Sequence, residues 1–233
     1  NNIYGTRVIA DLAVKYGTKK FVMISTDKAV NPTNVMGCSK RICEIYCQSL
    51  NQAIQQGSVE GVTQFVTTRF GNVLGSNGSV IPIFKEQIKK GGPVTVTHPD
   101  IIRYFMLIPE ACKLVLEAGT MGKGGEIFVF DMGKPVKIVD LAKRMIALSG
   151  AKDVKIEFTG LRDGEKLYEE VLNDKEGTIP TSNPKIMVAK VREYDYATAC
   201  ENEQRLLAAS KTFDDMAIVR VMKEIVPEYR SRC

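Results

Sequence analysis

The sequence predicts an α/β protein in which helices alternate with the strands of a parallel sheet. Apolar, β-branched runs at 21–24 and 62–70 indicate buried strands. The segments 3–16 and 37–56 repeat apolar residues at helical spacing. A helix–strand–helix–strand order favours parallel strands joined by crossover helices.

The rest of the chain continues this alternation without an internal repeat. Pro109 suits the first turn of a helix, where its missing N–H has no partner to lose, and Gly150 ends a later helix. We expect further helices at 80–90, 109–118, 136–149 and 213–226, and further strands at 94–97, 126–130, 154–158 and 185–189.

Composition limits the classes of function. The 233 residues are 44% hydrophobic and 25% charged, with a formal net charge of +5 and scattered basic residues, which argues against a nucleic-acid partner. Six cysteines without a C-x-x-C pair and a single histidine, His98, offer almost no ligand set for zinc, so we expect no metal. No apolar run reaches the roughly 18 residues of a membrane span, and we expect a reducing, cytoplasmic setting.

The stretch 21–40 is the candidate active site. Its strand ends at four polar residues, Ser25-Thr26-Asp27-Lys28, and a connection containing proline and asparagine leads to a helix that carries Lys40. In an open α/β sheet, ligands bind outside the carboxyl ends of the strands. Hydroxyl, carboxylate and amine groups at such an edge predict acid–base chemistry, and a surface Asp–Lys pair is the alternative.

A glycine-rich loop at 71–79 lies between a strand and a helix. Its spacing is G-x-x-x-G-x-x-G, whereas dinucleotide-binding loops have G-x-G-x-x-G. We therefore expect it to bind something other than a dinucleotide pyrophosphate, with a flexible connection as the alternative.

Four ordered motifs resemble those of the extended short-chain dehydrogenase/reductase family, most closely its nucleotide-sugar 4,6-dehydratases. The resemblance covers the chain from residue 2 to about residue 170, with Asp163 where the family has proline. The motifs are STDKAVNPTNVMGCSK at 25–40, RFGNVLGSNGSV at 69–80, HPDIIRYFM at 98–106 with IPEA at 108–111, and GLRDGEKL at 160–167.

The resemblance implies a Rossmann-like doubly wound parallel sheet, here only partial, with a smaller α/β substrate-binding domain. Residues 1–71 and 109–150 would form the second part of the NAD(P)-binding domain, and residues 72–108 and 151–233 the nucleotide-sugar-binding domain. The half that carries the dinucleotide fingerprint is not in the sequence. We therefore expect a fragment, inactive by itself, of a homo-oligomeric protein anchored at the inner face of a bacterial membrane.

The resemblance also implies catalytic roles. Asp27 would be the general acid and Lys28 the general base, while Thr26 would hydrogen-bond the 4-hydroxyl and Lys40 would hold the nicotinamide ribose. Met36 stands where the family has its catalytic tyrosine, which marks the large membrane-anchored subgroup. Because a thioether has no ionisable proton, Thr26, a water or a lysine must deprotonate the 4-hydroxyl.

Other residues of the motifs would hold the cofactor and the substrate. Ser25 and Arg69 are expected at the cofactor, together with Lys40. Arginine suits a diphosphate through its planar fork of donors, and an ion-paired or solvated arginine is the alternative. The residues expected to bind the nucleotide sugar are Asn72, Ser79, Arg103, Arg162 and Glu165, of which Glu165 could instead begin a helix.

The function implied is NAD- or NADP-dependent dehydration of a UDP-N-acetylhexosamine, first of all UDP-N-acetylglucosamine, to a 4-keto-6-deoxy sugar. The product would serve capsule or O-antigen polysaccharide synthesis. The alternatives are a nucleotide-sugar epimerase of the same family and a non-catalytic binding module. The adjacent Asp27 and Lys28 favour the dehydratase, because a simple 4-epimerase needs no acid–base pair for water loss.

Overall fold

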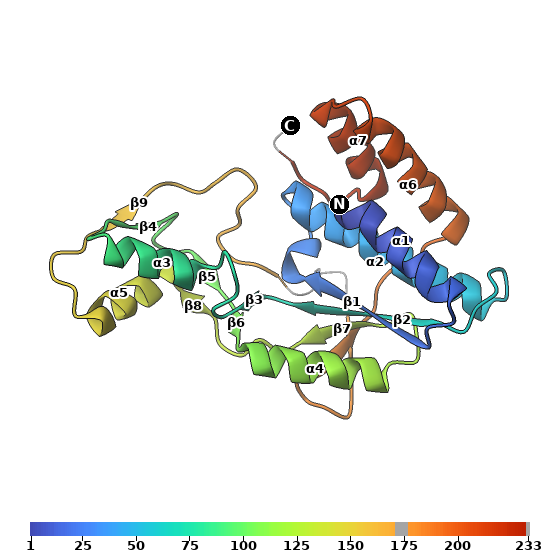
Figure 1. Ribbon diagram of the computed structural model, residues 1–233, viewed down its shortest axis with the longest axis horizontal. Helices are drawn as coiled ribbons and strands as arrows, with labels where there is room; N and C mark the ends of the chain where they lie inside the picture. The colour runs from blue at the N-terminus through green and yellow to red at the C-terminus, as the bar shows by residue number, and fades with distance from the viewer. Residues whose placement is uncertain (171–176, 232–233) are drawn as a thin grey trace. The chain divides into compact units, whose positions relative to one another are not determined.

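The computed structural model describes residues 1–170 and 177–231, and the chain divides into two compact units (Figure 1). Unit 1 has a five-stranded sheet, the strands of unit 2 form three two-stranded sheets, and each unit has its own apolar core. Unit 1 consists of Asn1–Phe70, Leu114–Asp131 and Glu170–Cys233, and unit 2 consists of Gly71–Lys113 and Met132–Glu169.

Unit 1 is built on a five-stranded sheet in the order β1-β2-β7-β11-β10. The strands β1 (Lys20–Thr26), β2 (Gln64–Phe70) and β7 (Ile127–Phe130) are parallel, as expected. Antiparallel β11 (Ile186–Ala189) and β10 (Thr178–Pro180) extend the sheet, because a short turn makes them a hairpin. Among the described strands, β1 has one neighbour, β2, so it forms an edge of the sheet.

Helices cover both faces of this sheet, as the predicted α/β class requires. α1 (Asn2–Lys15) and α2 (Val35–Gln55) lie on one face and α4 (Ile108–Met121) on the other (Figure 1). α6 (Tyr196–Ser210) and α7 (Asp215–Ile225) pack outside α2, which is therefore buried on most sides. No helix of the described ranges is long and apolar enough to cross a membrane.

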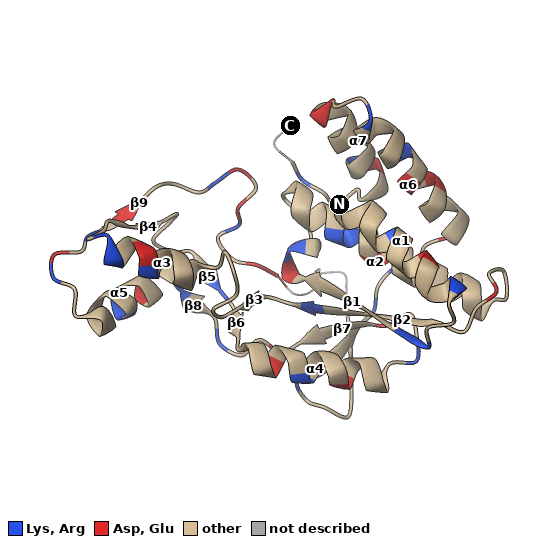
Figure 2. Cartoon of the chain, viewed as in Figure 1, with Lys and Arg blue, Asp and Glu red and all other residues tan. Residues whose placement is uncertain are grey.

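Unit 2 has a small core between two helices and a pair of strands. The core residues include Phe84, Ile88, Val94, Val96 and Ile138. Acidic and basic residues are interspersed over the elements of both units (Figure 2). The elements of unit 2 are β3 (Asn72–Val73), α3 (Val80–Lys89), β4 (Val94–Val96), β5 (Ile102–Arg103), β6 (Phe105–Met106), β8 (Val136–Lys137), α5 (Ile138–Ser149) and β9 (Ile156–Phe158).

The division into units differs from the expected domains in two long segments, besides residues 71 and 109–113, which belong to unit 2. Residues 132–150 belong to unit 2, because α5 packs against α3 and β4 and buries Ile138 and Ala142 in that core. The segment from Glu170 onward belongs to unit 1, because β11 pairs with β7 and the last two helices pack on α2. The helix expected from residue 136 begins two residues later, since Val136–Lys137 pairs with β5.

Three cysteines of α2 behave as small apolar residues. Cys38, Cys43 and Cys47 are buried. Burial raises the pKa of Cys38 to about 12 and the pKa of Cys43 to about 11. Because the thiolate is the nucleophile, we expect these side chains to be unreactive at neutral pH. Cys112 is exposed, and Cys233 lies outside the described residues.

Glu203 of α6 is a buried carboxylate whose protonation affects stability. Its side chain is 4% exposed, neither oxygen has a hydrogen-bond partner in the described chain, and Arg7 Nη1 lies 3.6 Å from Oε2. Burial raises the pKa of Glu203 to about 7, although the charge of Arg7 opposes this shift. The folded state therefore holds a proton that the unfolded state loses above its ordinary pKa, so this contribution to stability falls as pH rises from about 4.5 to about 7.

We expect Glu203→Gln to raise the free energy of unfolding at pH 8 by about 1–2 kcal/mol and to have little effect at pH 4.5. Glutamine has no charge to bury, which removes the penalty that appears when Glu203 ionises. Urea unfolding of the chain at the two pH values measures the difference. Exposed Glu201→Gln on the same helix is the control. An equal effect of Glu203→Gln at both pH values would contradict the assignment.

Candidate active site

The polar residues that follow β1 form a tight turn. β1 ends at Thr26, and Asp27–Ala29 forms one turn of 3-10 helix, η1. The Thr26 hydroxyl accepts a hydrogen bond from the backbone N–H of Lys28 at 3.4 Å. In a continuing strand, Asp27 and Lys28 would point to opposite faces. Because the strand has ended, their side chains meet on one side of the turn.

Asp27 is the centre of this turn. Thr26 Oγ1 and Lys28 Nζ each donate to Asp27 Oδ1, both at 2.8 Å. Asp27 is wholly buried, and its other oxygen, Oδ2, has no hydrogen-bond partner among the described residues. Leaving a buried acceptor unsatisfied costs about 1–3 kcal/mol, and such a group requires an explanation. A half-satisfied carboxylate beside a lysine suits proton transfer better than it suits stability.

The first turn of α2 lies directly against η1. Its cap is Asn34, whose Oδ1 accepts from the N–H of Gly37 at 2.8 Å. A Cβ at Gly37 would stand 2.1 Å from the carbonyl oxygen of Lys28, so only glycine permits this approach. Met36, beside Gly37, is 44% exposed. The contact through Gly37 fixes the start of the helix relative to Asp27 and Lys28.

Lys40 lies one helical turn after Met36 on the same face of α2. Its Nζ donates to the backbone carbonyl of Ile24 at 3.1 Å, two residues before Thr26. The hydrogen bond is exposed, so the ammonium remains accessible while it stays next to the carboxyl end of β1. The structure thus brings all five expected catalytic residues, Thr26, Asp27, Lys28, Met36 and Lys40, to one end of one strand.

A buried charge cluster lies behind the turn, centred on Glu44 of α2. Glu44 accepts from Ser25 Oγ at 2.6 Å, from Arg69 Nε and Nη2 at 2.8 and 2.7 Å, and from Arg41 Nη1 at 2.9 Å. Burial alone would raise the pKa of Glu44, but the charges and hydrogen bonds of Arg69 and Arg41 lower this pKa to about 2.

The cluster gives a structural role to Ser25 and Arg69, the two residues that were expected at the cofactor together with Lys40. Arg69 has no exposed surface, and both its guanidinium and the hydroxyl of Ser25 are hydrogen-bonded to Glu44. As placed, these side chains hold α2 against the ends of β1 and β2, and their contact with a cofactor stays a prediction. Glu44 and Arg41 were not predicted from the sequence. The available signal was a pair of opposite charges at i, i+3 within the helix.

Unit 2 contains the residues expected to bind substrate. One of them, Arg103, joins the segment around Ile102 to the segment 165–169 through hydrogen bonds. Its guanidinium donates to the carbonyls of Ile102, Lys166 and Leu167 at 2.8, 2.8 and 3.1 Å. It also pairs with Glu165 at 3.4 Å and Glu169 at 3.8 Å, and it is 9% exposed. This is the ion-paired alternative, and it favours positioning of the segment 165–169 over direct contact with a diphosphate.

The other four expected substrate residues lie near the surface of unit 2 or support its loops. Glu165 accepts from Thr97 Oγ1 and from the backbone N–H of Arg162, both at 3.1 Å. Arg162 itself is exposed. Asn72 donates to the carbonyl of Tyr104 at 3.2 Å. Ser79 caps α3, and its buried hydroxyl has no partner among the described residues. Phosphate binding by Arg162 and sugar binding by Asn72 and Ser79 stay predictions.

Comparison with known proteins identifies the family. The sequence profile described as "Polysaccharide biosynthesis protein" matches residues 1–191. The chain belongs to this family. It is 60% identical over 196 residues to the capsular polysaccharide biosynthesis protein CapD of Staphylococcus aureus, covering 83% of this chain and 32% of CapD. The chain therefore spans about a third of the length of this relative.

Solved structures confirm the predicted fold for this member of the polysaccharide biosynthesis protein family. Pen from Bacillus thuringiensis is 34% identical, with a TM-score of 0.76 over 84% of this chain and 60% of that chain. A dTDP-glucose 4,6-dehydratase from Bacillus anthracis, solved in complex with NAD, is 18% identical, with a TM-score of 0.61 over 72% of this chain and 57% of that chain. The second likeness shows the fold alone, a Rossmann-like α/β fold.

Proposed function

We propose that the protein containing this chain is an NAD(P)-dependent nucleotide-sugar 4,6-dehydratase of polysaccharide synthesis, acting on a UDP-N-acetylhexosamine. The observation that carries the proposal is the turn in which Asp27, buried and hydrogen-bonded through one oxygen only, pairs with Lys28 beside Lys40. The relationship to a capsular polysaccharide biosynthesis protein supports the setting. The membrane anchor and the homo-oligomer belong to this proposal.

The residues present fit one part of a dinucleotide site. Lys40 offers an accessible ammonium at the carboxyl end of β1, where open α/β sheets bind their ligands. We infer that it holds the nicotinamide ribose. When bound, NAD(P) would accept a hydride from C4 of the sugar and return it to C6.

The Asp27–Lys28 pair accounts for the protons of water loss. Proton transfer across its 2.8 Å hydrogen bond converts the ion pair into a neutral carboxylic acid and a neutral amine. The Lys28 amine then takes the proton from C5, and the Asp27 carboxyl gives its proton to the departing 6-hydroxyl, which leaves as water. The elimination step ends in the ion pair again. As hydride returns to C6, the Lys28 ammonium gives its proton back to C5, and the proton lost from the 4-hydroxyl replaces the one that Asp27 gave to water.

We expect Asp27→Asn and Lys28→Ala each to lower formation of the 4-keto-6-deoxy product by about 10²–10⁴-fold, because each removes one member of the acid–base pair. The assay uses the intact protein that contains this chain, with UDP-N-acetylglucosamine as substrate and detection of product by NMR. We expect Asp27→Asn to leave the melting temperature unchanged or higher, since the variant no longer buries a half-satisfied charge.

The controls are Asp215→Asn and Lys211→Ala, which change exposed residues on the C-terminal helices by the same chemistry. Near-wild-type turnover of either turn variant would remove the role assigned to that residue. A product that keeps its 6-hydroxyl and is inverted at C4 would instead establish the epimerase alternative. Turnover by none of the proteins, with or without added NAD(P), would favour the binding module.

A further inference from the structure

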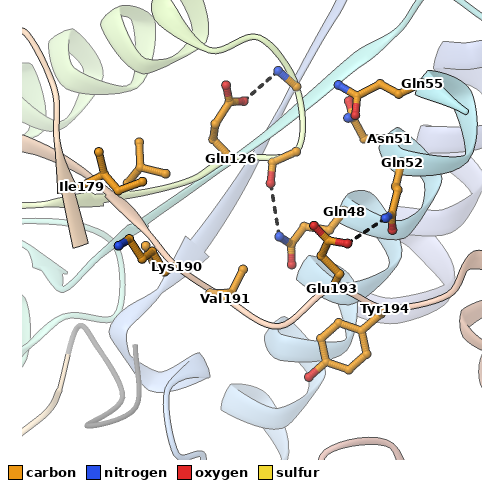
Figure 3. Close-up of a pocket in the computed structure, with 14 residues that line it drawn as sticks. Gln48, Asn51, Gln52, Gln55, Glu126, Ile179, Lys190, Val191, Glu193 and Tyr194 are labelled. Atoms are coloured by element: carbon orange, nitrogen blue, oxygen red, sulfur yellow. Dashed lines mark hydrogen bonds between the residues drawn. The ribbon is translucent and has the colours of Figure 1, made fainter. Parts of the chain in front are cut away.

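Four side-chain amides form a stripe on α2, away from the candidate active site. They recur at i, i+3, i+4 and i+7, which places them on one face of the helix. The stripe consists of Gln48, Asn51, Gln52 and Gln55. These residues line a cavity of about 440 Å³ within unit 1 (Figure 3).

The cavity lies at the opposite end of the sheet from the acid–base pair. It is bounded by Gly124, Gly125 and Glu126, immediately before the amino end of β7. Asp27 and Lys28 follow the carboxyl end of β1, and both strands run parallel to β2. The cavity therefore shares no residue with the proposed catalytic centre, and the inference below does not depend on the proposed reaction.

The two walls of the cavity differ in character. The wall opposite the amides comes from the hairpin β10–β11 and the segment after it, and Figure 3 shows Ile179 and Val191 on the side facing the glutamines. The apolar residues of this wall are Ile179, Val188, Ala189 and Val191. A slot with one amide wall and one apolar wall suits a flat ligand with a polar rim and an apolar face.

Two side-chain amide atoms of the stripe on α2 are buried without a partner in the described chain. Asn51 is 2% exposed, and its Oδ1 accepts from the backbone N–H of Phe65 at 2.9 Å, which leaves Nδ2 as an unpaired donor. Gln48 Nε2 donates to the carbonyl of Gly125 at 3.2 Å, which leaves Oε1 as an unpaired acceptor. Backbone hydrogen bonds thus fix both amides, and each keeps one buried polar atom without a partner in the described residues.

Charge at the cavity disfavours ionic ligands. The stripe itself is neutral, and the two carboxylates, Glu126 and Glu193, outnumber the single cation, Lys190. Glu126 accepts from the backbone N–H groups of Lys123 and Gly124, and Glu193 accepts from Gln52, so both are held in place. This balance repels phosphate and carboxylate groups, and both carboxylates already accept hydrogen bonds from neutral donors.

We propose that the amide cavity binds one neutral pyranose ring as a site separate from catalysis. Sugar hydroxyls both donate and accept, so they match the unpaired Asn51 Nδ2 and Gln48 Oε1. The C–H face of the ring packs on the apolar wall. The volume falls within the range of about 300–1,000 Å³ typical of small-molecule sites. In a protein related to polysaccharide synthesis enzymes, such a site gives free or polymer-terminal sugar a place to bind.

The test is saturation-transfer NMR on the intact protein with N-acetylglucosamine and glucose, compared with glucuronic acid and glucosamine. We expect the neutral sugars to bind with dissociation constants of about 1 mM, and the charged sugars to bind at least about tenfold more weakly. Gln55→Trp places an indole in the cavity and should weaken binding of the neutral sugars at least about tenfold.

Gln56→Trp is the matched control, because Gln56 is the exposed neighbour that does not line the cavity. If Gln55→Trp does not fold, Gln52→Leu, which removes one amide of the stripe, replaces it. Absence of binding by both neutral sugars overturns the proposal. Equal binding by Gln55→Trp and wild type, or preference for either charged sugar, overturns it as well.

Discussion

Replacing Arg69 by methionine is expected to destabilise the chain by about 3 kcal/mol at pH 7, because it leaves Glu44 buried with part of its charge uncompensated. Both residues are wholly buried and joined by two hydrogen bonds of 2.8 and 2.7 Å. Arg41 and Ser25 still contact Glu44 in the variant, which places the effect at the low end of the about 3–5 kcal/mol measured for broken buried pairs. Urea unfolding measures it.

The pH dependence distinguishes this electrostatic cause from simple loss of packing. The pKa of Glu44 is lowered to about 2, so its contribution to stability is present above its unfolded value and is lost as pH falls toward 2. The deficit of Arg69→Met should therefore shrink between pH 5 and pH 3. The double variant Arg69→Met/Glu44→Met, which removes the buried pair, should be more stable than the single one. A double variant that is less stable than Arg69→Met would contradict this account.

Gly37→Ala is expected to lower product formation by about 10²-fold although alanine is the better helix former. Its Cβ would stand 2.1 Å from the carbonyl oxygen and 3.0 Å from the carbonyl carbon of Lys28, and neither backbone atom can move by a rotamer change. The start of α2 or the η1 turn must shift, and a misplacement of about 1 Å can cost about 10²-fold in rate. We also expect a loss of stability of about 1–3 kcal/mol from overpacking.

Gly5→Ala is the matched control for this effect. Gly5 lies inside α1, and a Cβ there has no atom within 4 Å, so alanine should stabilise the chain by up to about 1 kcal/mol through helix propensity. Turnover of the intact protein and thermal unfolding of the chain are measured for both variants. Similar behaviour of Gly37→Ala and Gly5→Ala would show that the contact between α2 and η1 is not required.

Local sequence patterns predicted the elements of this fold well. The apolar run at 21–24 and the stripe on 37–56 became β1 and α2, because burying one face of each element is what the patterns describe. The direction of each strand and the unit to which each helix belongs were harder to predict from the sequence. The antiparallel β11 depends on the turn that joins it to β10, and the place of α5 in unit 2 depends on which core accepts Ile138.

In the candidate site, too, local features were predicted from the sequence and long-range contacts were not. The sequence predicted Asp27 and Lys28 because the end of a strand is a local feature. It did not predict that Glu44 holds Arg69, or that Arg103 binds the carbonyls of Lys166 and Leu167, because such partners come from distant segments. An arginine in a binding motif has the same letter whether it faces a ligand or the core. Only the fold distinguishes the two cases.

The position of β1 at the edge of its sheet has a consequence for the turn that carries Asp27 and Lys28. One side of the strand is aligned by β2, residue against residue from Lys20 to Thr26, and the other side offers its backbone hydrogen-bonding groups to a further strand. A strand that pairs there would end beside Asp27 and Lys28. Pairing at this edge would therefore align β1 from both sides and fix the backbone that leads into Asp27 and Lys28.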